Sequence, residues 1–355
     1  MTLGPLLEEA LGQPADRVSL ASAAYPSRSV ALEGKRDVLD AALAYLAPWW
    51  QTTGNGAVRV QVVEGSEGVE SHLRALIREH QVIARTDLIL AQVELPSWDY
   101  GWARFRGNNF YDLTLGRNDH IVVITGQSGP PPFLAAARTI RNLTVSQWLG
   151  DGALHLHAAA LQIRDRGIVL LGDRHAGKTT QVCSMLERGI ARFVSNDRVC
   201  LFPDGNLAGL PVSVNLRGDT QRRFPAINTD ERPASNPHNI SPDRPAEDLS
   251  LSTAEFAARF NAARHPGFVL TDVFHLQRDE RLEGITASRA SPEQTRNLLL
   301  ENTLEHIDQS QPFWRTSWST APLLPSLGNV RCWSIGSGAN TVDLTTDAII
   351  YRLDP

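Results

Sequence analysis

The chain has 355 residues, of which 42% are hydrophobic and 21% are charged, a composition typical of globular proteins and long enough for two domains. Its formal net charge of -5, from 34 Lys and Arg against 39 Asp and Glu, argues against nucleic acid as a partner. The sequence shows no membrane-spanning stretch, no signal peptide and no metal-ligand spacing among its three cysteines, so we expect a cytoplasmic protein that does not bind membranes.

Residues 1–145 are predicted to form a smaller α+β domain of unknown role. The first 55 residues carry weak helical signals, of which the clearest is a helix over 36–50, where apolar side chains recur at helical spacing. Further elements are expected in chain order: a strand over 58–63, a helix over about 69–79, short strands around Ile83 and over 88–93, a hairpin of 110–114 with 120–125, and a helix over 133–149.

The segment 96–102 is aromatic, with Trp98, Tyr100 and Trp102 two residues apart. These side chains could line a pocket for a flat or apolar ligand. We favour the other interpretation, that they anchor a small sheet, because large aromatic residues are mostly buried.

Residues 146–355 are predicted to form an α/β domain with a central mixed sheet. Its expected elements are strands over 154–163, 168–171, 191–195, 199–202, 209–216, 267–276 and 330–335, and helices over 177–189, 252–264, 292–306 and 343–353. Between them, residues 229–250 are rich in Pro, Asn, Asp and Arg, and we expect a long loop that is either a lid or a disordered insertion.

Residues 172–179 fit the phosphate-binding pattern G-x-x-x-x-G-K-[ST] without a mismatch. The two glycines permit a tight turn, and the N–H groups entering the next helix point at phosphate oxygens. Lys178 would reach the β/γ-phosphates, and the Thr179 hydroxyl would help to hold Mg²⁺. The predicted order of strand, glycine loop and helix is the order that the motif requires. The nucleotide-binding residues are then Gly172, Asp173, Arg174, His175, Ala176, Gly177, Lys178, Thr179 and Thr180.

Phosphoryl transfer also needs a carboxylate near the loop. Asp197 is the best candidate, since it follows a predicted strand that can lie beside the one feeding the loop; alternatively, it is only a turn residue at a strand end. His155 and His157 share one face of their strand, and His157 is either structural or a proton relay.

These residues together resemble the catalytic domain of HPr kinase/phosphorylase, and still more the HPr-kinase-related small kinases of bacterial biosynthetic clusters. The resemblance rests on His157 fifteen positions before Gly172, the phosphate loop, Arg188-Gly189, and a strand ending Ser195-Asn196-Asp197. It covers residues 150–220 well, residues 250–355 only as an order of elements, and the first 145 residues hardly at all.

The resemblance implies an ATP-dependent kinase in which Lys178 and Thr179 match the nucleotide and Mg²⁺ residues. His157 matches the histidine paired with the catalytic acid, and Asp197 matches the second of two consecutive aspartates, which with Thr179 would hold Mg²⁺. Two positions depart from the family's pattern: Asn196 stands where the family has its first aspartate, the general base, and Thr180 replaces a glutamate.

Because asparagine cannot accept a proton at neutral pH, three alternatives follow. Asp197 takes the role of base, the acceptor needs little help from a base because the transition state is loose, or the site binds nucleotide without transferring phosphate. Three arginines that precede the long loop, Arg217, Arg222 and Arg223, would neutralise phosphate or bind an anionic acceptor, or are simply exposed.

We therefore expect transfer of the γ-phosphoryl group of ATP, with Mg²⁺, to a hydroxyl of a small molecule or peptide. Catalysis is assigned to Lys178, Asp197 and His157, and acceptor binding to Asn196 and the loop at 217–250, with the first domain as a further candidate. The alternatives are a nucleotide-binding regulatory or scaffold protein, and an enzyme that uses ATP to activate a substrate for condensation. The sequence does not distinguish ATP from GTP, and it allows a homo-oligomer without predicting one.

Overall fold

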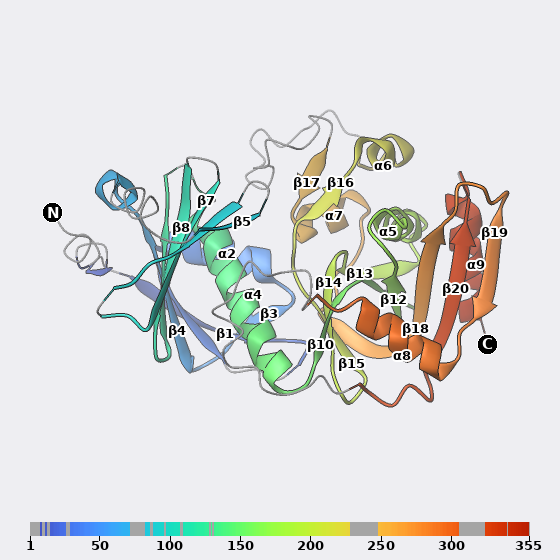
Figure 1. Cartoon of the computed structure of the whole chain (residues 1–355), viewed down its shortest axis with the longest axis horizontal. Helices are drawn as coiled ribbons and strands as arrows, with labels where there is room; N and C mark the ends of the chain where they lie inside the picture. Colours follow the sequence, from blue (N-terminus) through green and yellow to red (C-terminus); the bar gives the residue numbers. More distant parts are fainter. Residues whose placement is uncertain are drawn as a thin grey trace. The chain divides into compact units, whose positions relative to one another are not determined.

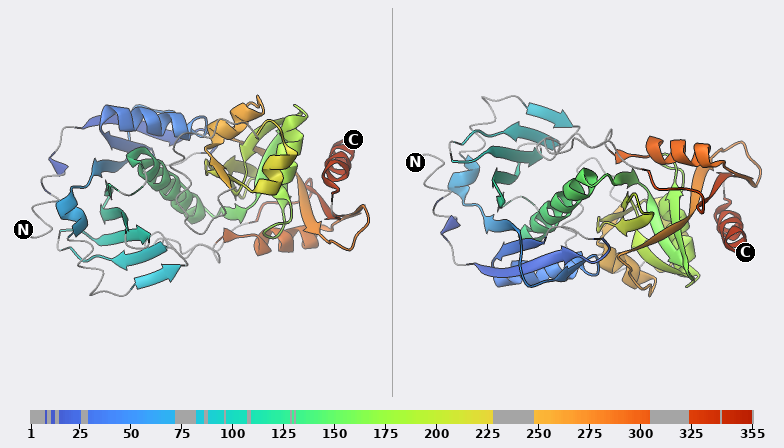
Figure 2. Two further views of the ribbon diagram at one scale, coloured as in Figure 1. Left: turned by 90° about the horizontal axis from the view of Figure 1, so that it is seen from above. Right: turned by 90° about the horizontal axis from the view of Figure 1, so that it is seen from below.

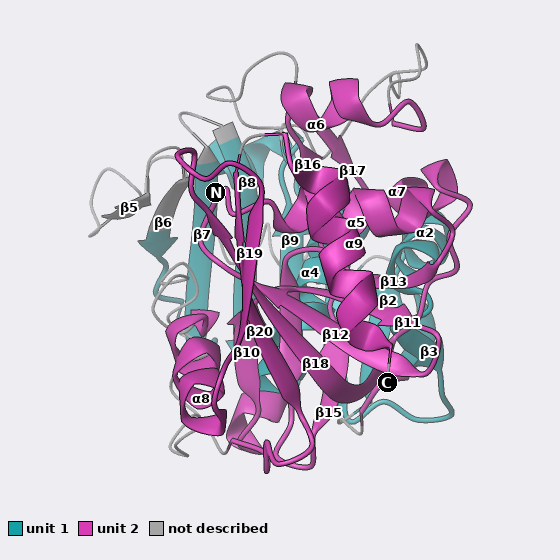
Figure 3. Cartoon of the chain, turned by 90° about the vertical axis from the view of Figure 1, so that its right-hand side faces the viewer, with its two compact units in different colours: residues 1–22, 26–147, 309–317 teal, residues 23–25, 148–308, 318–355 magenta. Residues whose placement is uncertain are grey.

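The chain folds into two compact units, shown in Figure 3. Unit 1 comprises residues 1–22, 26–147 and 309–317, and unit 2 comprises residues 23–25, 148–308 and 318–355. The computed structural model describes residues 8, 11–12, 15–25, 29–71, 82–85, 88–95, 97–106, 109–127, 129, 131–227, 248–304, 324–338 and 340–354. One of the passages from unit 1 to unit 2, at residues 147–148, lies inside a helix.

Unit 1 is built on a nine-stranded sheet in the order β3-β1-β2-β4-β9-β8-β7-β6-β5 (Figure 1). The neighbours β2, β4 and β9 are parallel, and the strands from β9 to β5 pair antiparallel as a meander. The strands are β1 (Asp16–Ser22), β2 (Val30–Gly34), β3 (Trp50–Thr52), β4 (Val58–Glu64), β5 (Val82–Arg85), β6 (Leu88–Gln92), β7 (Tyr100–Arg106), β8 (Asn109–Arg117) and β9 (His120–Thr125), and the helices are α2 (Arg36–Leu46) and α4 (Pro132–Gly150).

Two predictions for unit 1 are wrong. The first 55 residues contain the strands β1, β2 and β3 beside a single clear helix, because the short apolar run of β2 is buried throughout and pairs on both sides. The helix α2 ends at Leu46 and not at Trp50, since the proline that follows Ala47 holds that residue in an extended conformation. The hairpin and α4 are confirmed; the helix predicted over 69–79 is seen over residues 67–71, and its remainder lies outside the described residues.

The aromatic segment packs on the sheet of unit 1. Trp98 lies against a core of buried side chains from β4, β7, β8 and β9. Tyr100 covers Gly116, where an added Cβ would lie 1.9 Å from the tyrosine ring, and burial raises the Tyr100 pKa to about 12. These contacts agree with the favoured interpretation, in which the segment anchors a sheet.

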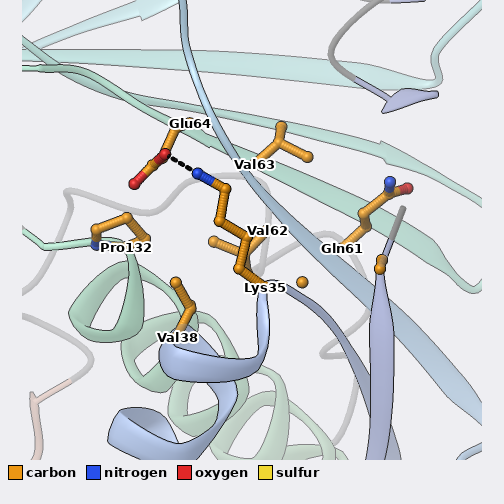
Figure 4. A pocket seen from close by; sticks show the side chains of 9 residues that line it. Lys35, Val38, Gln61, Val62, Val63, Glu64 and Pro132 are labelled. Atoms are coloured by element: carbon orange, nitrogen blue, oxygen red, sulfur yellow. Dashed lines mark hydrogen bonds and ion pairs between the residues drawn. The ribbon is translucent and has the colours of Figure 1, made fainter. Parts of the chain in front are cut away.

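A cavity in unit 1 is too small for a ligand. It lies beside the ion pair of Lys35 and Glu64 (Figure 4) and has a volume of about 10 Å³, which is close to the minimum for one water molecule.

Unit 2 contains a mixed sheet in the order β10-β14-β15-β18-β12-β11-β13, with β20 pairing with β18 and β19 pairing with β20. Its strands β12, β18 and β20 are parallel, while the other pairs are antiparallel. The strands are β10 (Leu154–His157), β11 (Ala159–Ile163), β12 (Arg166–Leu171), β13 (Ala191–Ser195), β14 (Arg198–Leu201), β15 (Asn206–Gly209), β18 (Gly267–Arg278), β19 (Ile285–Arg289) and β20 (Arg331–Ser337).

Helices cover both faces of this sheet. Figures 1 and 2 show α5 and α9 on one face of the parallel strands and α8 on the other. A separate two-stranded sheet, β16 with β17, lies beside α6 and α7 in the same unit. These elements are α5 (Lys178–Glu187), α6 (Gly218–Arg223), α7 (Thr253–Arg259), α8 (Pro292–Glu301), α9 (Val342–Leu353), β16 (Val214–Leu216) and β17 (Leu249–Leu251).

Several predicted boundaries in unit 2 are wrong. The strand expected over 154–163 is broken at Ala158, and the strand expected over 209–216 is divided between β15 and β16. The helices α7 and α8 end earlier than predicted, and α6 and β19 were not predicted at all. Residues 228–247, most of the long loop, lie outside the described residues, as do 305–306 at the end of the helix expected over 292–306.

A buried ion cluster fixes the parallel strands. The fully buried carboxylate of Asp272 on β18 accepts hydrogen bonds from Nε of Arg166 on β12 (2.6 Å) and from Nε of Arg331 on β20 (2.8 Å). Removing one partner of such a cluster typically costs about 3–5 kcal/mol, because it leaves a buried charge uncompensated. The cluster therefore holds three strands in register, and their carboxyl ends carry the candidate site.

Within the described residues, no helix is long and apolar enough to cross a membrane.

Candidate functional site

The loop between β12 and α5 requires both of its motif glycines. Gly172 has φ +138°, and a Cβ there would lie 2.4 Å from the carbonyl oxygen of Leu276. Gly177 has φ +96° and is the residue immediately before α5, and His175 also has a positive φ of 75°. The backbone therefore turns sharply and delivers the free N–H groups of the first turn of α5 to the carboxyl edge of the sheet.

Lys178 is nearly buried, with 7% of its surface exposed. Its Nζ donates to the carbonyl oxygens of Gly172 (2.6 Å) and Asp173 (3.2 Å), so the ammonium group closes the loop on itself. Burial lowers the pKa of Lys178, and the nearby carboxylates of Asp197 and Asp173 partly offset this. The arrangement places one positive charge against two backbone carbonyl groups of the loop.

The break at Ala158 explains how the other site residues reach the loop. The chain of β10 and β11 runs antiparallel to the chain of β13 and β14, with His157 opposite Arg198 and Ala160 opposite Ser195. Between these registers the regular strand pairing is interrupted, although the Ala158 N–H still donates to the carbonyl of Asp197. Asn196 and Asp197 therefore lie between β13 and β14 beside His157, where the Asn196 side chain reaches the loop and the Asp197 side chain reaches His157.

Asn196 contacts the phosphate-loop threonine directly. Its Nδ2 donates to Oγ1 of Thr179 at 3.2 Å. The asparagine is only 6% exposed, and its Oδ1 has no hydrogen-bond partner among the described residues. An unsatisfied buried carbonyl is costly, so this oxygen calls for a donor or a cation beyond what the described residues supply.

Asp197 is paired with His157. The distance from His157 Nε2 to Asp197 Oδ1 is 3.3 Å, and Arg198 Nε lies 3.6 Å from the other carboxylate oxygen. Burial raises the pKa of Asp197, but the hydrogen bond from His157 and the charges of Arg198, His157 and Lys178 outweigh it and lower the pKa to about 2. The carboxylate is 43% exposed, and at neutral pH it is ionised and accessible to a substrate.

The oxygen atoms at the loop suit Mg²⁺ bound together with a phosphate chain. Magnesium usually takes one or two protein oxygens and completes its octahedron with water and substrate phosphates. The Thr179 hydroxyl and Asn196 Oδ1 are such oxygens. The carboxylate of Asp197 belongs to the next residue in the sequence. The described residues contain no cluster of three or more His, Cys, Asp or Glu side chains that could bind a metal alone.

The remaining predicted site residues, Thr180 and the three arginines, do not share one position. Arg217 reaches the loop, with its Nη2 3.2 Å from Nε2 of His175, whose pKa is lowered by burial and by neighbouring arginines. Thr180 Oγ1 lies 3.4 Å from Oγ1 of Thr220 on α6. Arg223 pairs with Asp343 of α9 at 3.0 Å, and Arg222 is exposed in the last turn of α6.

Three side chains near the loop were not predicted. His275 of β18 lies opposite Leu171, and burial lowers its pKa. Gln181 and Thr346 are buried and hydrogen-bonded to each other between α5 and α9. No motif marks these positions, since each is defined by a contact between segments that lie about 100 residues or more apart in the sequence.

No family model matches the chain, and a search of curated proteins finds none with significant similarity.

Proposed function

We propose that unit 2 is an ATP-dependent kinase that transfers the γ-phosphoryl group to a hydroxyl of a small molecule or peptide. The observation that carries this proposal is the hydrogen bond from Asn196 to Thr179. It brings the end of β13 to the phosphate-binding motif, and the buried Asn196 Oδ1 beside it has no hydrogen-bond partner in the described part of the chain. The resemblance to HPr-kinase-like P-loop kinases is part of the proposal.

The loop would hold the phosphates through three kinds of contact. Apart from the Ala176 N–H, which already donates to the Asp173 carbonyl, the N–H groups of residues 173–179 would point at phosphate oxygens, as at other helix N-termini. The Lys178 ammonium exchanges its two carbonyl partners for phosphate oxygens and neutralises charge that develops during transfer. Thr179 and Asn196 would hold Mg²⁺, which when bound would neutralise further phosphate charge.

Asp197 is the proposed base. The acceptor hydroxyl gives its proton to the Asp197 carboxylate while its oxygen forms a bond to the γ-phosphorus, and the bond to the β-phosphate oxygen breaks to release ADP. His157 positions the carboxylate through the 3.3 Å contact. With a pKa of about 2, Asp197 is a weak base, which fits a loose transition state in which proton transfer occurs late.

The titration of Lys178 provides a test on the alkaline side. Burial lowers its pKa below the ordinary 10.5, so the ammonium group should lose its proton at a lower pH than an exposed lysine. We expect kcat/KM for ATP, which reports the free enzyme, to fall at alkaline pH with an apparent pKa below 10.5. Lys178→Arg, which stays charged, should not show this fall of kcat/KM at alkaline pH. The same alkaline fall in Lys178→Arg would contradict its assignment to Lys178.

Phosphorus NMR of the reaction mixture tests the kinase proposal. With Mg²⁺, ATP and a panel of hydroxyl compounds and hydroxyl-containing peptides, the expected signals are ADP and a new phosphate ester. Formation of ADP and free phosphate only when a second, condensing substrate is present would instead indicate activation of a substrate. ATP that remains intact throughout, although it binds, would contradict transfer.

A second candidate function is a nucleotide-binding regulatory or scaffold protein, which the amide at Asn196 favours. Asn196→Asp places a carboxylate beside Thr179 and distinguishes the two. If the site transfers phosphate, the substitution should raise the affinity for Mg²⁺ and change the turnover rate measured by ADP release. A scaffold should show no turnover in either form, and that result would favour the second candidate.

A further inference from the structure

A cavity of about 210 Å³ adjoins the glycine loop in unit 2. It lies at the carboxyl ends of β18 and β20, beside the start of α9. Ligands of open α/β sheets bind at this edge. Its volume is below the roughly 300–1,000 Å³ of pockets that enclose a whole drug-sized ligand, so it suits one part of a ligand whose remainder lies elsewhere.

The first turn of α5 separates this cavity from the catalytic groups. Gly177, Thr180 and Gln181 line the cavity, and they share one helix face because they are three and four positions apart. Lys178 and Thr179 do not line it, nor do Asn196, Asp197 and His157. A phosphate chain bound along the loop would therefore have its transferable end at Thr179 and Asn196, and its other end at Thr180 and the cavity.

We infer that this cavity binds the nucleoside part of the nucleotide, an inference that rests on the proposed function. The cavity offers apolar contact from Leu276 and Val342, hydroxyl groups from Thr180 and Thr220, and the guanidinium of Arg278. A planar guanidinium stacks on aromatic rings, and hydroxyl groups hydrogen-bond to a ribose or to the edge of a base.

The wall formed by α9 is held in place by buried hydrogen bonds. The Thr346 hydroxyl lies 2.7 Å from Gln181 Oε1, 2.9 Å from Ser184 Oγ and 3.0 Å from the Val342 carbonyl. Gln181 Nε2 donates to the same carbonyl at 3.3 Å. Arg223 of α6 pairs with Asp343 at the adjoining position of α9. Because these groups fix α9 against α5, the cavity is formed before a ligand enters it.

The phosphoryl acceptor is the other ligand to consider for this cavity. Its hydroxyl has to come within hydrogen-bond reach of the base. Asp197 and its partner His157 are absent from the cavity lining, while the loop and the first turn of α5 lie in between. The geometry thus favours the nucleoside in the cavity and the acceptor on the side of Asp197.

Binding of ATP and of inorganic tripolyphosphate to the whole chain separates the nucleoside contribution from the phosphate contribution. The variants are Val342→Trp, which fills the cavity, and Arg278→Ala, which removes the guanidinium; Arg296→Ala on the exposed side of α8 is the control. Isothermal titration with Mg²⁺ should show ATP affinity at least tenfold weaker in Val342→Trp and several-fold weaker in Arg278→Ala. Tripolyphosphate affinity should be unchanged in all three variants.

The outcomes are distinguishable. If ATP binds to both cavity variants as to the unmodified chain, the nucleoside assignment is wrong, and a raised KM for the acceptor in these variants would assign the cavity to the acceptor instead. Should the unmodified chain bind neither ATP nor tripolyphosphate, the proposed function itself fails. Unchanged tripolyphosphate binding also shows that a cavity variant is folded.

Discussion

Lys178→Ala is expected to lower kcat/KM for ATP by about 10²–10³-fold, the size of effect seen when one donor that stabilises developing charge is removed. The side chain supplies the ammonium group inside the glycine loop, where it bonds to the carbonyls of Gly172 and Asp173. Nucleotide affinity should fall with the rate, because the same group meets the phosphates before and during transfer. Steady-state kinetics with varied ATP, together with titration of ADP, measure both effects.

The sequence provides a matched control, since it contains only two lysines, Lys35 and Lys178. Lys35 pairs with Glu64 at the surface of unit 1, where the pair is half exposed (Figure 4). Surface pairs of this kind contribute little to stability, so Lys35→Ala should leave ATP affinity and turnover unchanged. Both variants need a melting temperature close to that of the unmodified chain. Full transfer activity in Lys178→Ala would refute the model of the site.

The second large effect is expected for Asp197→Asn, which should lower turnover by about 10²–10⁴-fold while ATP affinity changes little. The substitution keeps the size of the side chain and a hydrogen-bonding group beside His157, but it removes the atom proposed to accept the proton. Single-turnover measurements at saturating ATP separate the transfer step from binding. His157→Ala should have a smaller effect, since it removes only the group that positions Asp197.

The exposed Asp165, in the turn between β11 and β12, provides the control substitution Asp165→Asn. Retention of turnover in Asp197→Asn would exclude this residue as the base. A larger loss in His157→Ala than in Asp197→Asn would transfer the role of base to the histidine.

Much of the fold around the glycine loop could be predicted because its signals are local. An apolar run, two glycines and a helical repeat determine β12, the loop and α5 within about twenty residues of sequence. The start of α7, predicted at residue 252, is also a local signal, since Ser252 and Glu255 form both hydrogen bonds of a capping box. The position of Asn196 and Asp197 beside the loop followed from their place at the end of a strand.

The remaining features depend on long-range contacts that leave no local pattern. The break at Ala158 exists because the chain changes partners from β14 to β13 around Asn196 and Asp197, and composition does not signal such a change. The wall of α9 is attached to α5 by hydrogen bonds between residues more than 160 positions apart. The sequence also suggested Asp197 as the Mg²⁺ ligand beside Thr179, whereas the residue that contacts Thr179 is Asn196.

The most direct test of the central claim is the site at which an acyl-phosphate derivative of ATP modifies the protein. Such a reagent transfers its acyl group to a lysine held at the phosphate chain and releases ATP, and mass spectrometry of the digested protein identifies the modified residue. The model predicts modification of Lys178 and not of Lys35, and suppression by excess ATP with Mg²⁺. Equal modification of both lysines, or modification of Lys178 that excess ATP does not reduce, would contradict nucleotide binding at this loop.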